Sequence, residues 1–210
     1  MRPGRSEFTR KEWRCVQSHS TPARVQRWLS NLPYNWQPKG ATCFSFRGVV
    51  AQNRAQCLEG ALAAATILEQ HGHPPLLVSI ESWDMLDHVL FLFKEKGRYG
   101  AIARSRLPAL HGRKPVFRRV RDLVMSYYDP YIDKTGRITG YAVADLRVLG
   151  AYDWRLSPRN VWKVDRFLCE LPHREIRGSD ARYAYWHRRY QEFKKHHPTQ
   201  EPDFYDVPAL

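Results

Sequence analysis

The sequence predicts an α+β fold in which one central helix packs on a small antiparallel sheet, with further helices at the periphery. An alanine-rich segment at 57–72 has the composition of a long helix. Apolar runs of strand length follow at 76–80, 88–93 and 99–103, and a turn-like Lys-Glu-Lys-Gly-Arg stretch separates the last two. A helix followed by such a hairpin is typical of a helix that packs on an antiparallel sheet.

The length and composition suit one folded domain with extensions at both ends. A chain of 210 residues fits within a single core. Hydrophobic residues make up 43% of the chain, enough to exclude a wholly disordered protein. We expect a basic, loosely ordered arm at 1–20, an α+β domain at 21–178, and a basic aromatic helix and tail at 179–210 that dock on the domain.

Charge and cysteine usage narrow the functional classes. Lys and Arg outnumber Asp and Glu by 34 to 21, and the net charge of +13 favours contact with phosphates, anionic surfaces or acidic proteins. No apolar run has the length of a signal peptide or a membrane span, so we expect a soluble, cytoplasmic protein. The four cysteines are scattered and form no Cys-x-x-Cys pair, so we expect free thiols, without a disulfide scaffold or a structural zinc finger. We also expect no cofactor.

The sequence predicts two short helices and a loop before the central helix. Thr21 can cap a helix and Pro22 is tolerated in its first turn, so a helix is predicted to start there. Residues 32–40 contain two prolines and a glycine, which predicts a loop that could lie over a site. Ser45 is expected to cap a second short helix that reaches about Asn53.

The central helix is the strongest local signal. Alanine and leucine favour helix, and Gly72 followed by Pro74 is a typical stop. Its alanines are small on nearly every side, which lets neighbouring elements approach closely and predicts a buried helix. Cys57 stands at its N-terminus. Beyond the hairpin we expect three further elements: a helix at 120–128, a weaker strand at 138–143 and a helix at 180–195.

Cys57 and His88 are the candidate catalytic pair. A thiolate is the reactive form of cysteine, and the free N–H groups at a helix N-terminus favour it. The base in such sites lies on a separate element, within hydrogen-bond reach. His88 begins a predicted strand after the helix and is preceded by Asp84 and Asp87, so we expect it at the sheet end that faces Cys57.

Four segments in this order resemble the transglutaminase-like superfamily, a branch of the papain-like fold. They are Gln-Cys-Leu-Glu-Gly-Ala at 56–61, His-Gly-His-Pro-Pro at 71–75, Asp-His-Val at 87–89 and Gly-Arg-Tyr-Gly at 97–100. The similarity covers about residues 45–105 and is closer to uncharacterised bacterial members than to true transglutaminases. It implies that Cys57 is a nucleophile and His88 its base. The implied reaction is hydrolysis of an amide or isopeptide bond, or transfer of its acyl group to an amine. The implied substrate is a protein or peptide.

The Asp that completes the catalytic triad of the resembling family is missing from this sequence. Family members orient the histidine with an Asp on the next strand, but the matching stretch here reads Ala-Ile-Ala-Arg-Ser at 101–105. Ser105 is the candidate that accepts or relays a hydrogen bond there, and Asp87 or Asp129 are alternatives from elsewhere. For the oxyanion we expect the backbone N–H of Cys57 with the side chain of Gln52 or Gln56.

Other interpretations of these residues remain open. Free cysteine is often a buried packing residue, and the pair at Cys57 and His88 could be structural. A non-catalytic module on the same fold could use its basic surface to bind nucleic acid or an acidic protein, through the clusters at 113–121 and 182–197. His71 and His73 are candidate metal ligands. The glycine and prolines beside them are more typical of the end of a helix, so we expect no metal site.

Overall fold

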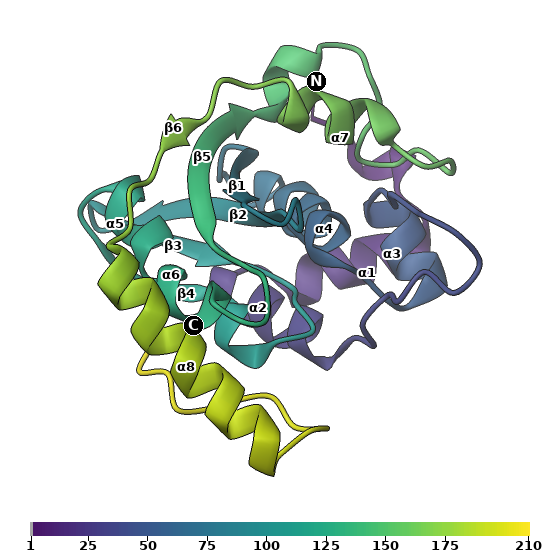
Figure 1. The fold of residues 1–210 in the computed structure, drawn as a ribbon. Helices are drawn as coiled ribbons and strands as arrows, with labels where there is room; N and C mark the ends of the chain where they lie inside the picture. The colour runs from purple at the N-terminus through teal and green to yellow at the C-terminus, as the bar shows by residue number, and fades with distance from the viewer. Residues whose placement is uncertain (1) are drawn as a thin grey trace.

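A six-stranded antiparallel sheet forms the centre of the computed structural model, which describes residues 2–210 (Figure 1). Its strand order is β4-β3-β2-β1-β5-β6. The strands are β1 (Leu76–Ser82), β2 (His88–Glu95), β3 (Arg98–Ile102), β4 (Arg113–Phe117), β5 (Ile138–Asp145) and β6 (Arg174–Glu175). The predicted α+β class and the antiparallel pairing of the hairpin strands β2 and β3 are confirmed.

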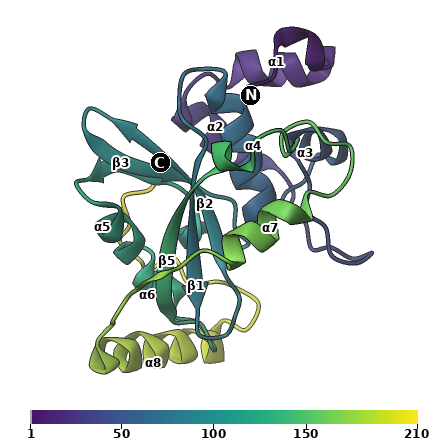
Figure 2. The same cartoon turned by 90° about the horizontal axis from the view of Figure 1, so that it is seen from above.

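Helices cover both faces of this sheet. Across residues 2–210 the eight α-helices are α1 (Arg10–Ser18), α2 (Pro22–Asn31), α3 (Phe46–Gln52), α4 (Cys57–Glu69), α5 (Val120–Met125), α6 (Tyr128–Tyr131), α7 (Trp162–Cys169) and α8 (Asp180–His196). Figure 2 shows α1 to α4 and α7 on one side of the sheet and α5, α6 and α8 on the other. The fold therefore has two hydrophobic cores, one on each face of the sheet.

Strand β2 contributes to both cores because successive side chains of a strand point to opposite faces. Val89, Phe91 and Phe93 belong to the core around α4. Leu90 and Leu92 belong to the core under α5 and α6. Burial on both faces explains why the sequence of this strand is continuously apolar and does not alternate between apolar and polar residues.

Helix α4 is the buried centre of the first core. Every residue from Leu58 to Glu69 is buried, as its small side chains predict. At its C-terminal end the Glu69 carboxylate accepts two hydrogen bonds from the buried Arg155 guanidinium, at 2.6 and 2.7 Å. Near its N-terminal end Gly60 lies so close to the chain after β3 that a Cβ there would be 2.8 Å from Cβ of Arg104. The start of α4 is thus fixed closely against the segment that follows β3.

The N-terminal segment differs from its prediction. Residues 1–20 were expected to be a loosely ordered arm, but the described part contains helix α1. Thr9 caps it by accepting from the backbone N–H of Glu12, and the Glu12 carboxylate accepts from the backbone N–H of Thr9 at 2.7 Å. Val16 of α1 is buried in the core around α4, and Glu12 pairs with Arg47 of α3 at 2.7 Å. Burial of this one apolar face orders the segment.

The other elements agree with the sequence in part. Helices α2 and α3 begin after the caps Thr21 and Ser45, as predicted, and α8 matches the helix expected at 180–195. The helix expected at 120–128 is divided into α5 and α6, and the basic stretch before it contains strand β4. Strand β6 and helix α7 were not predicted. Among the helices of residues 2–210, none is long and apolar enough to cross a lipid bilayer.

We expect Gly60→Ala to destabilise the protein by about 1–3 kcal/mol, because the added methyl group would push Arg104 away from α4. This reverses the usual effect of Gly→Ala inside a helix, which is stabilising. Urea unfolding measures the change. Gly4→Ala is the control, since its Cβ would meet nothing nearer than 3.8 Å. A Gly60→Ala variant more stable than the wild type would contradict the close approach.

Candidate active site

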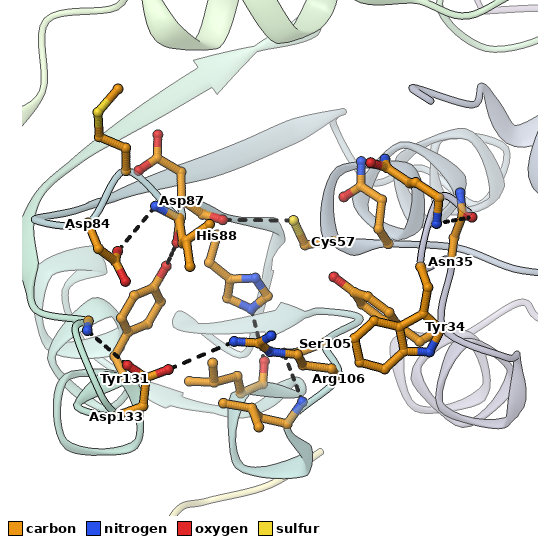
Figure 3. A pocket seen from close by; sticks show the side chains of 18 of the residues that line it. Tyr34, Asn35, Cys57, Asp84, Asp87, His88, Ser105, Arg106, Tyr131 and Asp133 are labelled. Atoms are coloured by element: carbon orange, nitrogen blue, oxygen red, sulfur yellow. Dashed lines mark hydrogen bonds and ion pairs between the residues drawn. The ribbon is translucent and has the colours of Figure 1, made fainter. Parts of the chain in front are cut away.

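A pocket of about 550 Å³ opens where α4 begins and the β1–β2 loop ends. It is lined by side chains from the loop before α3, the start of α4, the β1–β2 loop, the segment after β3, the segment around α6 and helix α7. The catalytic candidates Cys57, His88 and Ser105 line it (Figure 3), together with the oxyanion candidate Gln56. Residues more than 100 positions apart in sequence meet here, since Asp165 and Cys169 of α7 also line this pocket.

Cys57 occupies the first position of α4, directly after its cap residue Gln56. Its Sγ lies 4.0 Å from the backbone carbonyl oxygen of Asp87, in the β1–β2 loop. Burial raises the pKa of the Cys57 thiol, and the charge of nearby Glu59 raises it further, which together outweigh the backbone N–H groups that lower it. The expectation of a lowered thiol pKa is therefore wrong, and Cys57 is a neutral thiol at neutral pH.

His88 is the first residue of β2 and is only 4% exposed. Its Nε2 lies 3.0 Å from the backbone carbonyl oxygen of Leu110. A carbonyl oxygen can only accept, so Nε2 carries the ring proton and Nδ1 carries a lone pair. Among residues 2–210 Nδ1 has no hydrogen-bond partner, and in Figure 3 the ring lies beside Cys57 in the pocket. Burial lowers the pKa of His88 to about 4, so the ring is neutral at neutral pH.

The pair shares the pocket without a direct hydrogen bond. The Sγ contact of Cys57 is to Asp87, and no hydrogen bond in the described part of the chain joins Cys57 to His88. Catalytic hydrogen bonds are often long in unliganded sites and shorten when the substrate binds. Proton transfer between the thiol and Nδ1 therefore requires a side-chain movement that brings the two groups within hydrogen-bond reach.

A backbone carbonyl holds the third position in place of the predicted side chains. Ser105 Oγ accepts from the backbone N–H of Leu107 at 3.1 Å and makes no bond to His88. Asp87 accepts from the backbone N–H of Ser82, and Asp129 is paired with Arg182 at 2.6 Å outside the pocket. The Leu110 carbonyl fixes the tautomer as an Asp would, and its hydrogen bond raises the pKa of His88, but burial lowers that pKa by more.

A buried guanidinium holds the Leu110 peptide in place. Arg113 donates to the carbonyl oxygens on either side of it, to Ala109 at 2.7 Å and to His111 at 2.8 Å. The hydroxyl of Tyr127 also donates to His111 O, at 3.1 Å, and its ring lies 3.9 Å from the guanidinium carbon. Arg113 is 0% exposed, so the expectation that it belongs to a solvated or partner-binding basic cluster is wrong. Its surroundings are carbonyl oxygens, which satisfy a guanidinium without a carboxylate.

The two predicted oxyanion side chains have different positions. Gln56 lines the pocket, and its Oε1 accepts from the backbone N–H of Leu58 at 2.8 Å. This bond orients the amide and leaves Nε2 without a partner among the described residues, available as a donor beside Cys57. Gln52 is exposed at the end of α3 and does not line the pocket. Of the two, only Gln56 remains a candidate.

A buried carboxylate joins the pocket loop to the start of α4. Glu59 is 0% exposed and accepts from the side chains of Asn35 and Thr42 and from the backbone N–H groups of Phe44 and Gln56, at 2.7 to 3.2 Å. The bond to Gln56 closes the capping box of α4. Residues 34–37 line the pocket beside these donors, as the loop prediction for 32–40 anticipates. Sequence reasoning missed Glu59, although a Glu three residues after a helix cap was a visible signal.

The chemistry of this pocket follows from its geometry. The chain matches no protein-family model and no curated protein. Within residues 2–210 no group of three or more His, Cys, Asp or Glu side chains is arranged to hold a metal ion, and His71 Nε2 lies instead 2.9 Å from the carbonyl oxygen of Val16. The pocket contains a thiol, a neutral imidazole with a free lone pair and amide N–H donors. Groups of these kinds can carry out nucleophilic attack on a carbonyl carbon.

We expect Glu59→Gln to lower the free energy of unfolding by about 2–4 kcal/mol, because an amide NH₂ would face buried donors that now share a carboxylate. Urea unfolding measures the loss. Limited proteolysis should also cut the 34–44 loop faster. Glu95→Gln, an exposed change at the β2–β3 turn, is the control. Equal stability of the two variants would contradict the role of Glu59.

Proposed function

We propose that this protein is a cysteine-dependent amide or isopeptide hydrolase or acyl transferase of the transglutaminase-like class. Cys57 is its nucleophile and His88 its general base. The observation that carries the proposal is the shared pocket, in which Cys57 starts a buried helix and His88 has Nε2 fixed by Leu110 and Nδ1 free. A protein or peptide substrate fits this chemistry, since the pocket is open to solvent and lined by residues of several loops.

The fold supports the same class. A buried helix that starts with the cysteine packs on an antiparallel sheet, and the strand that starts with the histidine lies next to the strand that follows the helix. The hairpin partner β3 corresponds to the strand on which the resembling family has its orienting Asp. This chain replaces that carboxylate with the Leu110 carbonyl, which arrives from the next turn.

The reaction can be written with the groups present. The thiol proton of Cys57 passes to Nδ1 of His88 while Sγ attacks the carbonyl carbon of the amide. The C–N bond breaks, the imidazolium returns its proton to the departing amine, and a thioester remains on Sγ. Water then gives a proton to Nδ1 and attacks the thioester, which releases a carboxylic acid, and Nδ1 returns the proton to the sulfur. If an amine attacks in place of water, a new amide forms. The Cys57 N–H and Gln56 Nε2 are the candidate donors to the oxyanion.

The pKa directions favour a neutral resting pair. A raised thiol pKa and a histidine pKa of about 4 leave both groups uncharged at neutral pH. In a thiolate–imidazolium pair the order of these pKa values would be reversed. The proposed enzyme therefore forms its nucleophile only during attack, by general-base catalysis.

The alternative function is a non-catalytic basic module that binds nucleic acid or an acidic protein. Its best support is α8, which has no buried residue and is rich in Arg and Lys. Several of these cations have partners within the chain: Lys194 pairs with Glu201, and Arg189 lies 4.3 Å from the ring centroid of Phe204. These contacts favour docking of the C-terminal tail on α8 over a free phosphate-binding face.

We expect the protein to cleave bonds in a pool of defined peptide and isopeptide substrates and to form a thioester on Cys57, both detected by mass spectrometry after an acid quench. Cys57→Ala should abolish both signals. His88→Ala should lower turnover by about 10²- to 10⁴-fold, as the loss of a general base does. Cys169→Ala is the matched control, a second cysteine of the same pocket. Turnover that survives in Cys57→Ala would refute the assignment.

We expect turnover to be constant through neutral pH and to fall as pH drops through about 4, because a protonated His88 cannot accept the thiol proton. Alkylation of Cys57 by iodoacetamide should be slow at neutral pH and rise with a midpoint above pH 9.0, the ordinary thiol value, because only the thiolate reacts. Peptide mass spectrometry after timed labelling measures this rate. Fast, pH-independent labelling near neutrality would show a thiolate–imidazolium pair instead.

A further inference from the structure

The pocket around Cys57 is acidic although the chain as a whole is basic. Four aspartates line it, and they come from three separate parts of the chain: Asp84 and Asp87 in the β1–β2 loop, Asp133 after α6 and Asp165 in α7. Among the described lining residues Arg106 is the one Arg or Lys. His88 adds no charge at neutral pH, because its pKa is about 4. The pocket therefore has a net negative charge in a protein of net charge +13.

Three of these carboxylates have no cationic partner within residues 2–210. Arg106 approaches only Asp133, at 3.9 Å. Asp84 accepts from Thr135 Oγ1 and the Leu86 N–H, and Asp87 from the Ser82 N–H, so neutral donors hold both in place. Elsewhere carboxylates are matched with Arg, as in the pairs Glu12–Arg47, Glu69–Arg155 and Asp129–Arg182. In a chain with 34 Arg and Lys residues, a group of unpaired carboxylates around a nucleophile is a specific arrangement.

The unpaired carboxylates also repel one another. Burial and the nearby charge of Asp87 raise the pKa of Asp165. A cation bound between them would relieve this repulsion and lower the pKa of Asp165 again. The buried ring of His88, with Nδ1 free toward the same pocket, is a second, independent sign that a ligand is received here.

The pocket walls select the kind of cation. Met85 and Leu86, at the lip beside the aspartates, are 86% and 59% exposed, and Trp36 in the loop before α3 is 66% exposed. Figure 3 shows Asp84, Asp87 and Asp133 on one side of Cys57 and Tyr34 on the other. A long aliphatic stem that ends in a charge suits a lip of exposed apolar side chains above carboxylates. A metal ion does not, since no group of these residues has metal-binding geometry within the described chain.

We propose that the Cys57 pocket selects a peptide substrate by a lysine or arginine side chain, which binds Asp84, Asp87 and Asp165 while the reacting carbonyl lies at Cys57. The position of the reacting carbonyl at Cys57 rests on the proposed function, whereas the selection of a cationic side chain does not. The three aspartates are then specificity-determining residues, and Met85 and Leu86 contact the aliphatic part of the bound side chain.

Binding to the Cys57→Ala variant tests the selection apart from turnover. The probes are acetylated, amidated pentapeptides Ala-Ala-Xaa-Ala-Ala with Xaa lysine, norleucine or glutamate, and tryptophan fluorescence and NMR titration report their affinities. Norleucine keeps the aliphatic stem without the charge. We expect the lysine peptide to bind about tenfold more tightly than the norleucine peptide, and the glutamate peptide to bind most weakly.

Asp84→Asn and Asp165→Asn should each weaken lysine-peptide binding by about threefold, and together should weaken it further towards the norleucine value, with Asp87 left as the remaining partner. Glu95→Gln changes the net charge equally at a distant exposed site and should leave affinity unchanged. Circular dichroism confirms folding of each variant. Equal affinity for lysine and norleucine, no binding of lysine peptide at about millimolar concentration, or no effect of the Asp variants overturns the proposal.

Turnover by the wild type separates this inference from the proposed function. Selective lysine binding without any cleavage or thioester would refute the enzyme and leave the cation site standing. Cleavage that proceeds equally well with lysine and norleucine peptides would support the enzyme and overturn the selection.

Discussion

The buried carboxylate of Glu59 is the interaction on which the arrangement of the pocket depends. It gathers four donors, two from side chains of the 34–44 loop, one from that loop's backbone and one from the cap residue of α4. A buried charge is tolerated only when hydrogen bonds satisfy it, so the loop and the helix start are fixed relative to each other. The same charge lies near Cys57 and helps to raise its pKa. The group that fixes the pocket loop therefore also helps burial to keep the proposed nucleophile protonated.

Burial has opposite effects on the position and the charge of the candidate pair. The enclosed ring of His88 is held in one tautomer by the Leu110 carbonyl, and that carbonyl is held by Arg113 through the carbonyls on either side. The same enclosure disfavours charge on both His88 and Cys57, so no ion pair forms at rest. An orienting carboxylate would have favoured the imidazolium. With a neutral orienting group, the pair keeps its geometry, and in the proposed reaction it would transfer a proton only as the sulfur attacks a substrate carbonyl.

The central elements could be predicted from sequence because their signals are local. The alanine composition and the Gly72 stop specified α4, and apolar runs around a turn specified β2 and β3. Helix α1 was also within reach, since Thr9 and Glu12 form a capping-box pattern. Strand β4 was not, because an edge strand with Arg113 and Pro115 has no apolar run.

The parts of the candidate site that the sequence could not show are those that depend on tertiary burial. Cys57 and His88 were found from their places at the start of a helix and a strand. The Leu110 carbonyl has no residue-type signature, because every residue carries such an oxygen. The role of Arg113 and the raised pKa of Cys57 follow from what surrounds them in space. A helix N-terminus favours a thiolate, but in this pocket burial is the larger effect.

The contrast between a basic protein and an acidic pocket constrains how a cationic substrate would be recognised. At long range a net charge of +13 repels a cation, and at about 0.15 M salt this repulsion is screened beyond roughly 8 Å. Partly buried carboxylates such as Asp84 and Asp165 are screened less, so their attraction survives where the repulsion does not. Recognition then depends on short-range contact inside the pocket and not on electrostatic steering. Such a site discriminates between side chains after encounter, through the rate of dissociation, which is where most differences in affinity arise.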